Sequence, residues 1–294
     1  MFFLNPPSGE SALIKSSYPN LQIVDYRGFP KGMRYFPGFL RKKIQKNVFN
    51  KLQKLCNTSF ELLWSFDNSV FYDLDALSAS VIKISHIVDF NQDFQFRRAS
   101  ISADICLAVN QHILKRQKAL NLNSFFINHG CHIPANPVPV KLTYKGDINI
   151  GYAGNLNIPF LDWELLHETY NCFSHISFHL AGPFTKKQIQ KENVFYHGKF
   201  APEQMQSFYQ QMDLLIIFYK YLQYPEQLSN PHKMMEYLAS GKAVLASWTE
   251  EYAGFHEKGL IRMAKNHEQF LDYFKEILQN PDYWNSPEMQ QERR

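Results

Sequence analysis

The second half of the sequence alternates short apolar runs with stretches of helical periodicity. The runs that predict strands are Ile148–Ala153, His175–Gly182, Asn193–His197, Asp213–Tyr219, Lys242–Trp248 and Leu260–Ala264. The intervening stretches that predict helices are Phe160–Phe173, Pro202–Met212, Pro231–Ser240 and Asn266–Gln279. Strands that alternate with helices predict right-handed βαβ units and a parallel sheet covered by helices on both faces.

The first half follows the same pattern with more interruptions. Strands are predicted at Phe2–Leu4, Leu21–Asp25, Phe60–Trp64, Ser80–Ser85, Asp104–Val109 and Ser124–Asn128, and helices at Phe36–Leu55 and Asn110–Leu120. Between the halves, Pro134, Pro137 and Pro139 predict a stiff, extended connector. We therefore predict an α/β protein with two doubly wound, Rossmann-like domains that face a cleft, at residues 1–135 and 148–280, joined by a linker at 136–147 and followed by a tail at 281–294.

Composition narrows the class of protein. Hydrophobic residues make up 45% and charged residues 20% of the 294 residues, which is typical of a globular chain. No run approaches the 18 apolar residues of a membrane span, and the start has no signal-peptide pattern. The 4 cysteines form no C-x-x-C pair. A disulfide scaffold and a zinc site are therefore not expected. A cytoplasmic setting is expected instead.

Positive charge is concentrated at the start of the chain. Residues 1–60 contain ten Lys or Arg and two acidic residues, whereas the whole chain carries only +4. Within Phe36–Leu55, apolar residues recur at helical spacing among Arg41, Lys42, Lys43, Lys46, Lys51 and Lys54. Such a helix fits either an anionic membrane surface or a solvated face above a packed one, and both interpretations stay open. Nucleic acid is not an expected partner, because no recognised nucleic-acid module is present.

One segment, from Leu228 to Ser247, carries several helix-terminus signals. Asn230 suits the N-cap and Gly241 the left-handed C-terminal position, so a helix of about ten residues follows a strand and a loop. Its free N–H groups favour an anion. Lys233 in the first turn opposes the helix dipole, and Glu236 lies on the same face. The pattern predicts a phosphate beside Lys233 and a ribose beside Glu236; the alternative is an ordinary amphipathic helix with a Lys–Glu surface pair.

A second glycine-containing turn follows the first strand of the second domain. In Gly151-Tyr-Ala-Gly-Asn-Leu, Gly154 would let the backbone approach a diphosphate closely, although such turns are also common without a ligand. Farther along come His-Leu-Ala-Gly-Pro-Phe from residue 179, Asn-Val-Phe-Tyr-His-Gly from 193, and Asn-Pro-His-Lys-Met-Met-Glu-Tyr-Leu-Ala-Ser-Gly from 230. In this order the motifs resemble the nucleotide-sugar domain of GT-B glycosyltransferases, especially the family 4-like group of bacterial surface polysaccharide synthesis. Residues 102–110 and 126–132 resemble signatures of the family's N-terminal domain.

The resemblance implies roles for particular residues. Glu236 would hold the donor ribose, Lys233 would lie near the donor phosphates, and Gly154 and Asn155 would form the loop beneath them. Ser229 and Asn230 would offer further donors to the diphosphate. A second glutamate of the family pattern is replaced by Leu228, with Glu226 nearby but out of register, and the first βα unit of the family's N-terminal domain has no counterpart.

Two other clusters could carry chemistry. Ser85-His-Ile-Val-Asp89 follows an apolar strand, so His86 and Asp89 are predicted on a loop where either could orient or deprotonate an acceptor hydroxyl, or serve as a loop histidine and a helix cap. Asp73 and Asp75 mimic a metal-binding D-x-D, but we favour a capping or solvated loop. His129 and His132 have no second ligand cluster, so no metal is predicted.

The resemblance implies an acceptor-side N-terminal domain and a nucleotide-sugar-binding C-terminal domain. The expected function is a retaining, metal-independent glycosyltransferase that moves a sugar from a nucleotide diphosphate sugar to a lipid-linked or polysaccharide acceptor. The donor is a substrate, and no cofactor is expected. The expected location is cytoplasmic, with the protein peripheral on the inner membrane face. The alternatives are a nucleotide-sugar epimerase of the same fold and a non-catalytic nucleotide-binding subunit.

Overall fold

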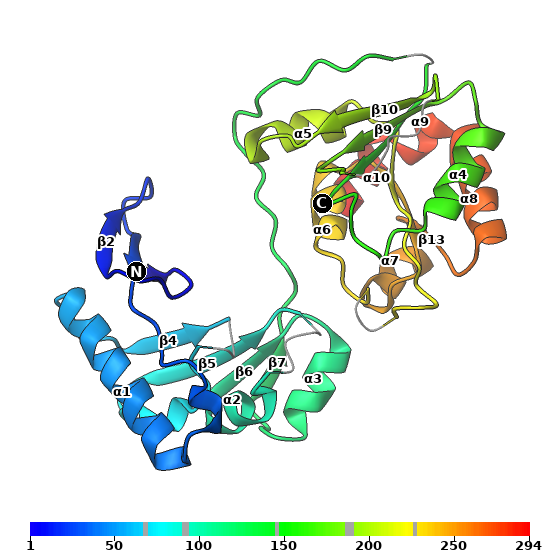
Figure 1. The fold of residues 1–294 in the computed structure, drawn as a ribbon. Coiled ribbons are helices and arrows are strands. Elements are labelled where there is room, and N and C mark those ends of the chain that lie inside the picture. The colour runs from blue at the N-terminus through cyan, green and yellow to red at the C-terminus, as the bar shows by residue number, and fades with distance from the viewer. Residues whose placement is uncertain (67–69, 90–93, 145–146, 186–190, 226–227) are drawn as a thin grey trace. The chain divides into compact units, whose positions relative to one another are not determined.

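The computed structural model describes residues 1–294 except 67–69, 90–93, 145–146, 186–190 and 226–227 (Figure 1). The chain divides into two compact units, Met1–Asn128 and His129–Arg294, each with its own sheet and hydrophobic core. We describe each unit by itself.

The C-terminal unit is built on one parallel sheet. In chain order its strands are β8 (Asn149–Ala153), β9 (Ser177–Ala181), β10 (Val194–Gly198), β11 (Leu214–Ile217), β12 (Ala243–Ser247) and β13 (Arg262–Ala264). Their spatial order is β10-β9-β8-β11-β12-β13. Each predicted strand of this half is present, because runs of buried aliphatic residues such as Leu214–Ile217 satisfy a sheet that is covered on both faces. The doubly wound α/β class is confirmed.

Helices cover both faces of this sheet. They are α4 (Trp163–Cys172), α5 (Pro202–Gln210), α6 (His232–Ser240), η3 (Glu250–Tyr252), α7 (Ala253–Glu257), α8 (His267–Gln279), α9 (Pro281–Trp284) and α10 (Pro287–Arg293). Asn266 caps α8 by accepting a hydrogen bond from Gln269 N at 2.8 Å. Helix α4 lies with α8, whereas α5 packs on α6 (Figure 1).

The two ends of this unit are tied to its helices. The proline-rich connector runs along α5, where Val138 N donates to Glu203 O at 2.9 Å and Val140 N donates to Ser207 Oγ at 3.1 Å. At the other end, Arg293 is buried, and its guanidinium donates to the carbonyls of Leu260 and Gly241. Burial lowers the pKa of Arg293 to about 10. The segment 281–294 is thus packed onto the unit by backbone-directed bonds.

The N-terminal unit contains two sheets. The larger is parallel, with β4 (Leu62–Ser65), β5 (Ile82–Ile87), β6 (Ile105–Ala108) and β7 (Ser124–Phe126) in that order. The smaller has the order β1-β3-β2, from β1 (Phe2–Leu4), β2 (Ala12–Lys15) and β3 (Gln22–Asp25), with β2 antiparallel to β3. The sequence did not predict β2, because its residues are all exposed and do not alternate.

Helices α1 (Gly38–Leu55), α2 (Phe96–Ser102) and α3 (Gln111–Lys118) complete this unit, with η1 (Met33–Tyr35) and η2 (Leu74–Ala76). Helix α1 buries Arg41, Gln45, Phe49 and Leu52, and Phe49 and Leu52 pack with Val24 of the small sheet. Arg41, predicted on the solvated basic face of this helix, is therefore buried. Phe39, one of the apolar residues at helical spacing, is instead 77% exposed. In the described part of the chain, no helix combines the length and apolarity needed to cross a membrane.

A histidine pair lies in the sheet of the C-terminal unit, with His179 buried and His197 half-buried. Nδ1 of His179 is 3.0 Å from Nε2 of His197, and Nε2 of His179 is 3.1 Å from Oδ1 of Asn149. Burial, together with the neighbouring His197, lowers the pKa of His179 to about 4. Both contacts are satisfied by neutral imidazoles, because each ring then supplies one donor and one acceptor.

This pair predicts acid sensitivity of folding. Above an unfolded-state pKa of about 6.5, His179 is neutral in both states. As the pH falls from there toward the folded value of about 4, the unfolded chain takes up a proton that the folded chain excludes. The unfolding free energy should therefore drop by up to about 3 kcal/mol across this range. Urea melts from pH 7 to pH 4 should show a shallower slope for His179→Gln, while the exposed-site control His112→Gln should keep the wild-type slope. Equal slopes in wild type and His179→Gln would contradict this.

Candidate functional site

The start of α6 and the loop after β8 form the candidate site. Helix α6 ends as predicted, with Gly241 left-handed at φ 79°. The prediction of Asn230 as N-cap is wrong: Pro231 occupies that position, and the helix begins at His232. Oδ1 of Asn230 instead accepts a hydrogen bond from the Tyr252 hydroxyl at 2.8 Å, a tertiary contact that local sequence does not contain.

Glycines bring the ends of β8 and β9 into close contact. Gly154 has φ +157° and Gly182 φ +140°. A Cβ on Gly182 would lie 1.8 Å from the Gly154 carbonyl oxygen, and a Cβ on Gly154 would lie 2.9 Å from Cε of Lys233. The predicted proximity of Gly154 and Lys233 is therefore observed. Asn155 is exposed beside them, and its Oδ1 accepts a hydrogen bond from Asn157 N at 2.9 Å.

Lys233 is held as a cation by neutral groups. Its ammonium donates to the Tyr219 hydroxyl and lies 5.2 Å and 5.0 Å from the ring centres of Tyr152 and Tyr219. Ring faces stabilise an ammonium without neutralising it. Within the described residues, no carboxylate forms an ion pair with Lys233. Its positive charge adds to the partial positive charge of the α6 N-terminus, so this position favours an anion.

Glu236 lies one turn farther along α6. Its Oε2 accepts a hydrogen bond from the Tyr209 hydroxyl at 2.5 Å, and its Oε1 is 3.5 Å from Nδ1 of His232. Burial acts to raise the pKa of Glu236, but the hydrogen bonds from His232 and Tyr209 outweigh it, so that the pKa is lowered. The carboxylate is thus ionised and 35% exposed, with room to accept further hydrogen bonds.

Sequence reasoning missed the surroundings of this carboxylate. Tyr209 comes from α5, and only the packing of α5 on α6 brings it to Glu236. His232 could have been found, because it precedes Glu236 by one helical turn. The ring of His129 lies 5.2 Å from that of His232, so residues first read as an N-terminal signature border α6 within the C-terminal unit. Burial, and then the charge of Glu236, raises the pKa of Cys131.

The remaining predicted donor residues are buried. Ser229 is fully buried, and Asn230 is 9% exposed. Leu228 belongs to the hydrophobic core of the unit, whereas Glu226 lies outside the described residues. The roles of Ser229, Asn230 and Asn155 toward a diphosphate stay predictions.

The predicted catalytic pair lies in the N-terminal unit. His86 was predicted on a loop, but it is the next-to-last residue of β5 and is buried, because the strand continues two residues beyond its predicted end. Its Nδ1 accepts a hydrogen bond from Trp64 Nε1 at 3.3 Å. Asp89 is exposed on the loop that follows. A role for either residue in the reaction stays a prediction.

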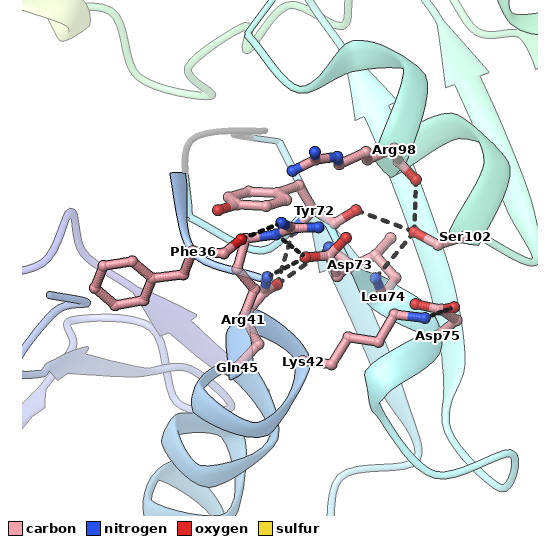
Figure 2. A network of polar contacts seen from close by, with 10 residues as sticks. All are labelled: Phe36, Arg41, Lys42, Gln45, Tyr72, Asp73, Leu74, Asp75, Arg98 and Ser102. Carbon is pink, nitrogen blue, oxygen red and sulfur yellow. Dashed lines mark hydrogen bonds and ion pairs between the residues drawn. The ribbon is translucent and has the colours of Figure 1, made fainter. Parts of the chain in front are cut away.

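The D-x-D carboxylates belong to an ion-pair network with α1, shown in Figure 2. Oδ2 of Asp73 accepts hydrogen bonds from Arg41 Nε at 3.0 Å and from Gln45 Nε2 at 3.2 Å. Asp75 is exposed and lies 2.5 Å from Lys42 Nζ. Asp73 occupies the N-cap position of η2, but its side chain makes no capping hydrogen bond and is instead a buried partner of Arg41. Over the described residues, no three His, Cys, Asp or Glu side chains are grouped to hold a metal ion.

Comparison with known proteins finds a similar family for the C-terminal part of the chain. Residues 163–294, which include all of α6, match the model of a family described as glycosyl transferase-like. Comparison of the sequence with curated proteins finds no match.

Solved structures establish the fold over the whole chain. Sucrose-phosphate synthase from Thermosynechococcus elongatus is similar with a TM-score of 0.69 at 12% identity, covering 100% of this chain and 83% of that one. Trehalose 6-phosphate synthase from Burkholderia multivorans is similar with a TM-score of 0.60 at 10% identity, covering 98% and 84%. A protein assigned as a UDP-N-acetylglucosamine 2-epimerase from Listeria monocytogenes is similar with a TM-score of 0.51 at 12% identity. The match covers 93% of this chain and 78% of that one. These likenesses show the GT-B fold over the whole chain, and residues 163–294 are similar to the glycosyl transferase-like family.

Proposed function

We propose that the chain transfers a sugar from a nucleotide diphosphate sugar, which binds at the start of α6. The observation that carries this proposal is the Lys233 ammonium, held above Gly154 by tyrosines and without a carboxylate in the described part of the chain. A diphosphate would supply the missing negative charge. On this proposal the ionised Glu236, one turn away, accepts hydrogen bonds from two ribose hydroxyls.

The chemistry proposed for this site is stabilisation of a leaving diphosphate. As the sugar–phosphate bond breaks, negative charge grows on the phosphate oxygens, and Lys233 with the helix N-terminus is placed to stabilise it. We propose that the reaction is metal-independent, because Asp73 is already engaged by Arg41 and Gln45. Retention of configuration is proposed from the resemblance to the family 4-like group.

The acceptor and the location are part of the same proposal. We propose a lipid-linked or polysaccharide acceptor and a peripheral position at the inner face of a membrane. The basic start of the chain supports this, because Lys43 and Lys46 of α1 are exposed. His86 and Asp89 are proposed to orient or deprotonate the acceptor hydroxyl.

Two substitutions test the donor site. Glu236→Ala should weaken UDP or GDP and the matching nucleoside alike, at least about tenfold, because the ribose loses charge-assisted hydrogen bonds. Lys233→Ala should weaken the diphosphate and leave the nucleoside nearly unchanged, because its partner is phosphate. Calorimetric titration of each variant measures both affinities.

The matched control is Lys275→Ala on α8, which removes an exposed lysine that pairs only with Asp272 among the described residues. This variant should bind as the wild type does. If the wild type binds a nucleotide and both site variants bind it equally well, the assignment of phosphate and ribose is wrong. Product formed from the donor without an acceptor would instead favour an epimerase.

A further inference from the structure

A large groove lies within the N-terminal unit, whereas the residues assigned to the donor belong to the other unit. It has a volume of about 1310 Å³ and runs between α1, the segment from Tyr26 to Tyr35, and the side chains of Tyr72 and Phe94. All of its lining residues belong to Met1–Asn128, so this unit forms the groove by itself. The proposed function leaves the groove without a role.

One wall of the groove is aliphatic. Ile44, Val48 and Leu55 of α1 face it and are half-buried, whereas the fully buried face of the helix packs on the body of the unit. Val70 adds a further aliphatic side chain. Binding of another apolar chain against this half-buried aliphatic wall is favourable, because the chain displaces water from apolar surface.

The floor beside this wall is fixed in place. Tyr72 N donates to Gln45 Oε1 at 3.0 Å, and Tyr72 O accepts from Ser102 Oγ at 3.1 Å. In Figure 2 the Tyr72 hydroxyl points away from the Asp73 carboxylate, and it has no hydrogen-bond partner among the described residues. The groove is therefore formed before any ligand arrives, which lowers the entropic cost of binding.

The charged side chains that line the groove are Arg27, Arg34 and Lys51 among the residues that the structure describes. No acidic residue belongs to this described part of the lining. The guanidinium of Arg34 is stacked 4.7 Å from the ring centre of Tyr35 and 5.6 Å from that of Phe94. Within the described residues, none of the three cations forms an ion pair. Three unneutralised cations around an aliphatic wall complement a ligand with an anionic end and an apolar chain.

We propose that this groove binds an amphiphile made of an aliphatic chain and a phosphate headgroup. The chain lies along Ile44, Val48 and Leu55, and the phosphate is held by Arg34 with Arg27 or Lys51. The assignment of this amphiphile as the acceptor, or as the anchor that carries it, rests on the proposed function. Binding itself does not, so the two can fail separately.

The test uses decyl phosphate below its self-association concentration, with decanol and inorganic phosphate as the two halves of the probe. Calorimetric titration of the whole chain, without nucleotide, should give saturable binding of decyl phosphate at least about tenfold tighter than either half. Val48→Asp, which places a carboxylate on the aliphatic wall, and Arg34→Gln, which removes an exposed cation, should each weaken it about tenfold or more. Lys43→Gln, on α1 but outside the groove, is the matched control and should bind as the wild type does.

The proposal is wrong if decyl phosphate shows no saturable binding, or if Arg34→Gln binds it as the wild type does. It is also wrong if Arg34→Gln and Lys43→Gln weaken binding equally, because that result would indicate diffuse attraction to a basic surface. Thermal unfolding checks that Val48→Asp is folded. If Val48→Asp is not folded, the affinity of Arg34→Gln for decyl phosphate tests the proposal alone. Lys233→Ala should leave decyl phosphate binding unchanged. If nucleotides still bind while decyl phosphate does not, this inference fails and the proposed donor site stands.

Discussion

Gly182→Ala should destabilise the C-terminal unit by more than about 3 kcal/mol and abolish nucleotide binding. The new Cβ would lie 1.8 Å from the carbonyl oxygen of Gly154, which is backbone and has no rotamer to escape into. The φ of +140° is also a conformation that residues with a Cβ rarely adopt. Either the end of β9 moves or the Gly154 loop moves, and the loop lies directly beneath Lys233.

Gly198→Ala is the matched control. Gly198 also has a positive φ, +68°, and its carbonyl accepts a hydrogen bond from Gly182 N, but a Cβ there would meet nothing within 4 Å. Its cost should be limited to about 1–2 kcal/mol of backbone strain. Thermal unfolding and calorimetry with UDP or GDP measure both effects. Similar melting temperatures and affinities for the two variants would show that the contact between Gly154 and Gly182 is not rigid.

Arg41→Met should cost the N-terminal unit about 3–5 kcal/mol. The side chains of Arg41 and Asp73 are 10% and 7% exposed, and the guanidinium also donates to the Phe36 carbonyl at 2.6 Å. Removing the cation leaves Asp73 ionised in a buried place with only Gln45 as its side-chain donor among the described residues (Figure 2). The uncompensated carboxylate, rather than the lost attraction, produces most of the loss.

A double-mutant cycle separates the two causes. Asp73→Asn in the Arg41→Met background should recover part of the stability, because the buried charge is gone. Lys42→Met is the control: its pair with Asp75 is 45% and 50% exposed, so its loss should cost no more than about 1 kcal/mol. Urea unfolding with and without Mg²⁺ provides the measurement. If Mg²⁺ rather than Asp73→Asn restores stability to Arg41→Met, the two aspartates are metal ligands after all.

The local sequence pattern was enough to predict the strands of the C-terminal sheet. A strand buried on both faces must consist of consecutive apolar residues, as in Leu214–Ile217, and a helix must end where Gly241 can adopt a left-handed φ. The meeting of Gly154 with Lys233 was also predictable, because parallel strands direct their carboxyl ends, and the helix starts that follow them, to one edge of the sheet.

Individual side-chain hydrogen bonds between elements far apart in the sequence were not predictable. Tyr209 is 27 residues from Glu236, and Asp73 is 32 residues from Arg41. Neither pair has a sequence signature, because a hydrogen bond depends on side-chain positions to a fraction of an ångström, whereas periodicity specifies only a face. The end of β5 was misjudged for a related reason. Ser85, His86 and Ile87 have no breaker among them, and only pairing with β6 decides that the strand continues to Ile87.

The sequence by itself therefore determined the α/β class, the order of the strands in the C-terminal unit, and the helix that carries Lys233 and Glu236, because these depend on periodicity and on glycine and proline within a few residues. The tertiary structure alone decided which groups surround those residues. It brought Tyr209 to the Glu236 carboxylate, paired Asp73 with Arg41, and formed a groove with aliphatic and cationic lining residues beside α1. The physical reason is that the protonation and partners of a charged group depend on burial and on donors brought by chain packing, which no local segment contains.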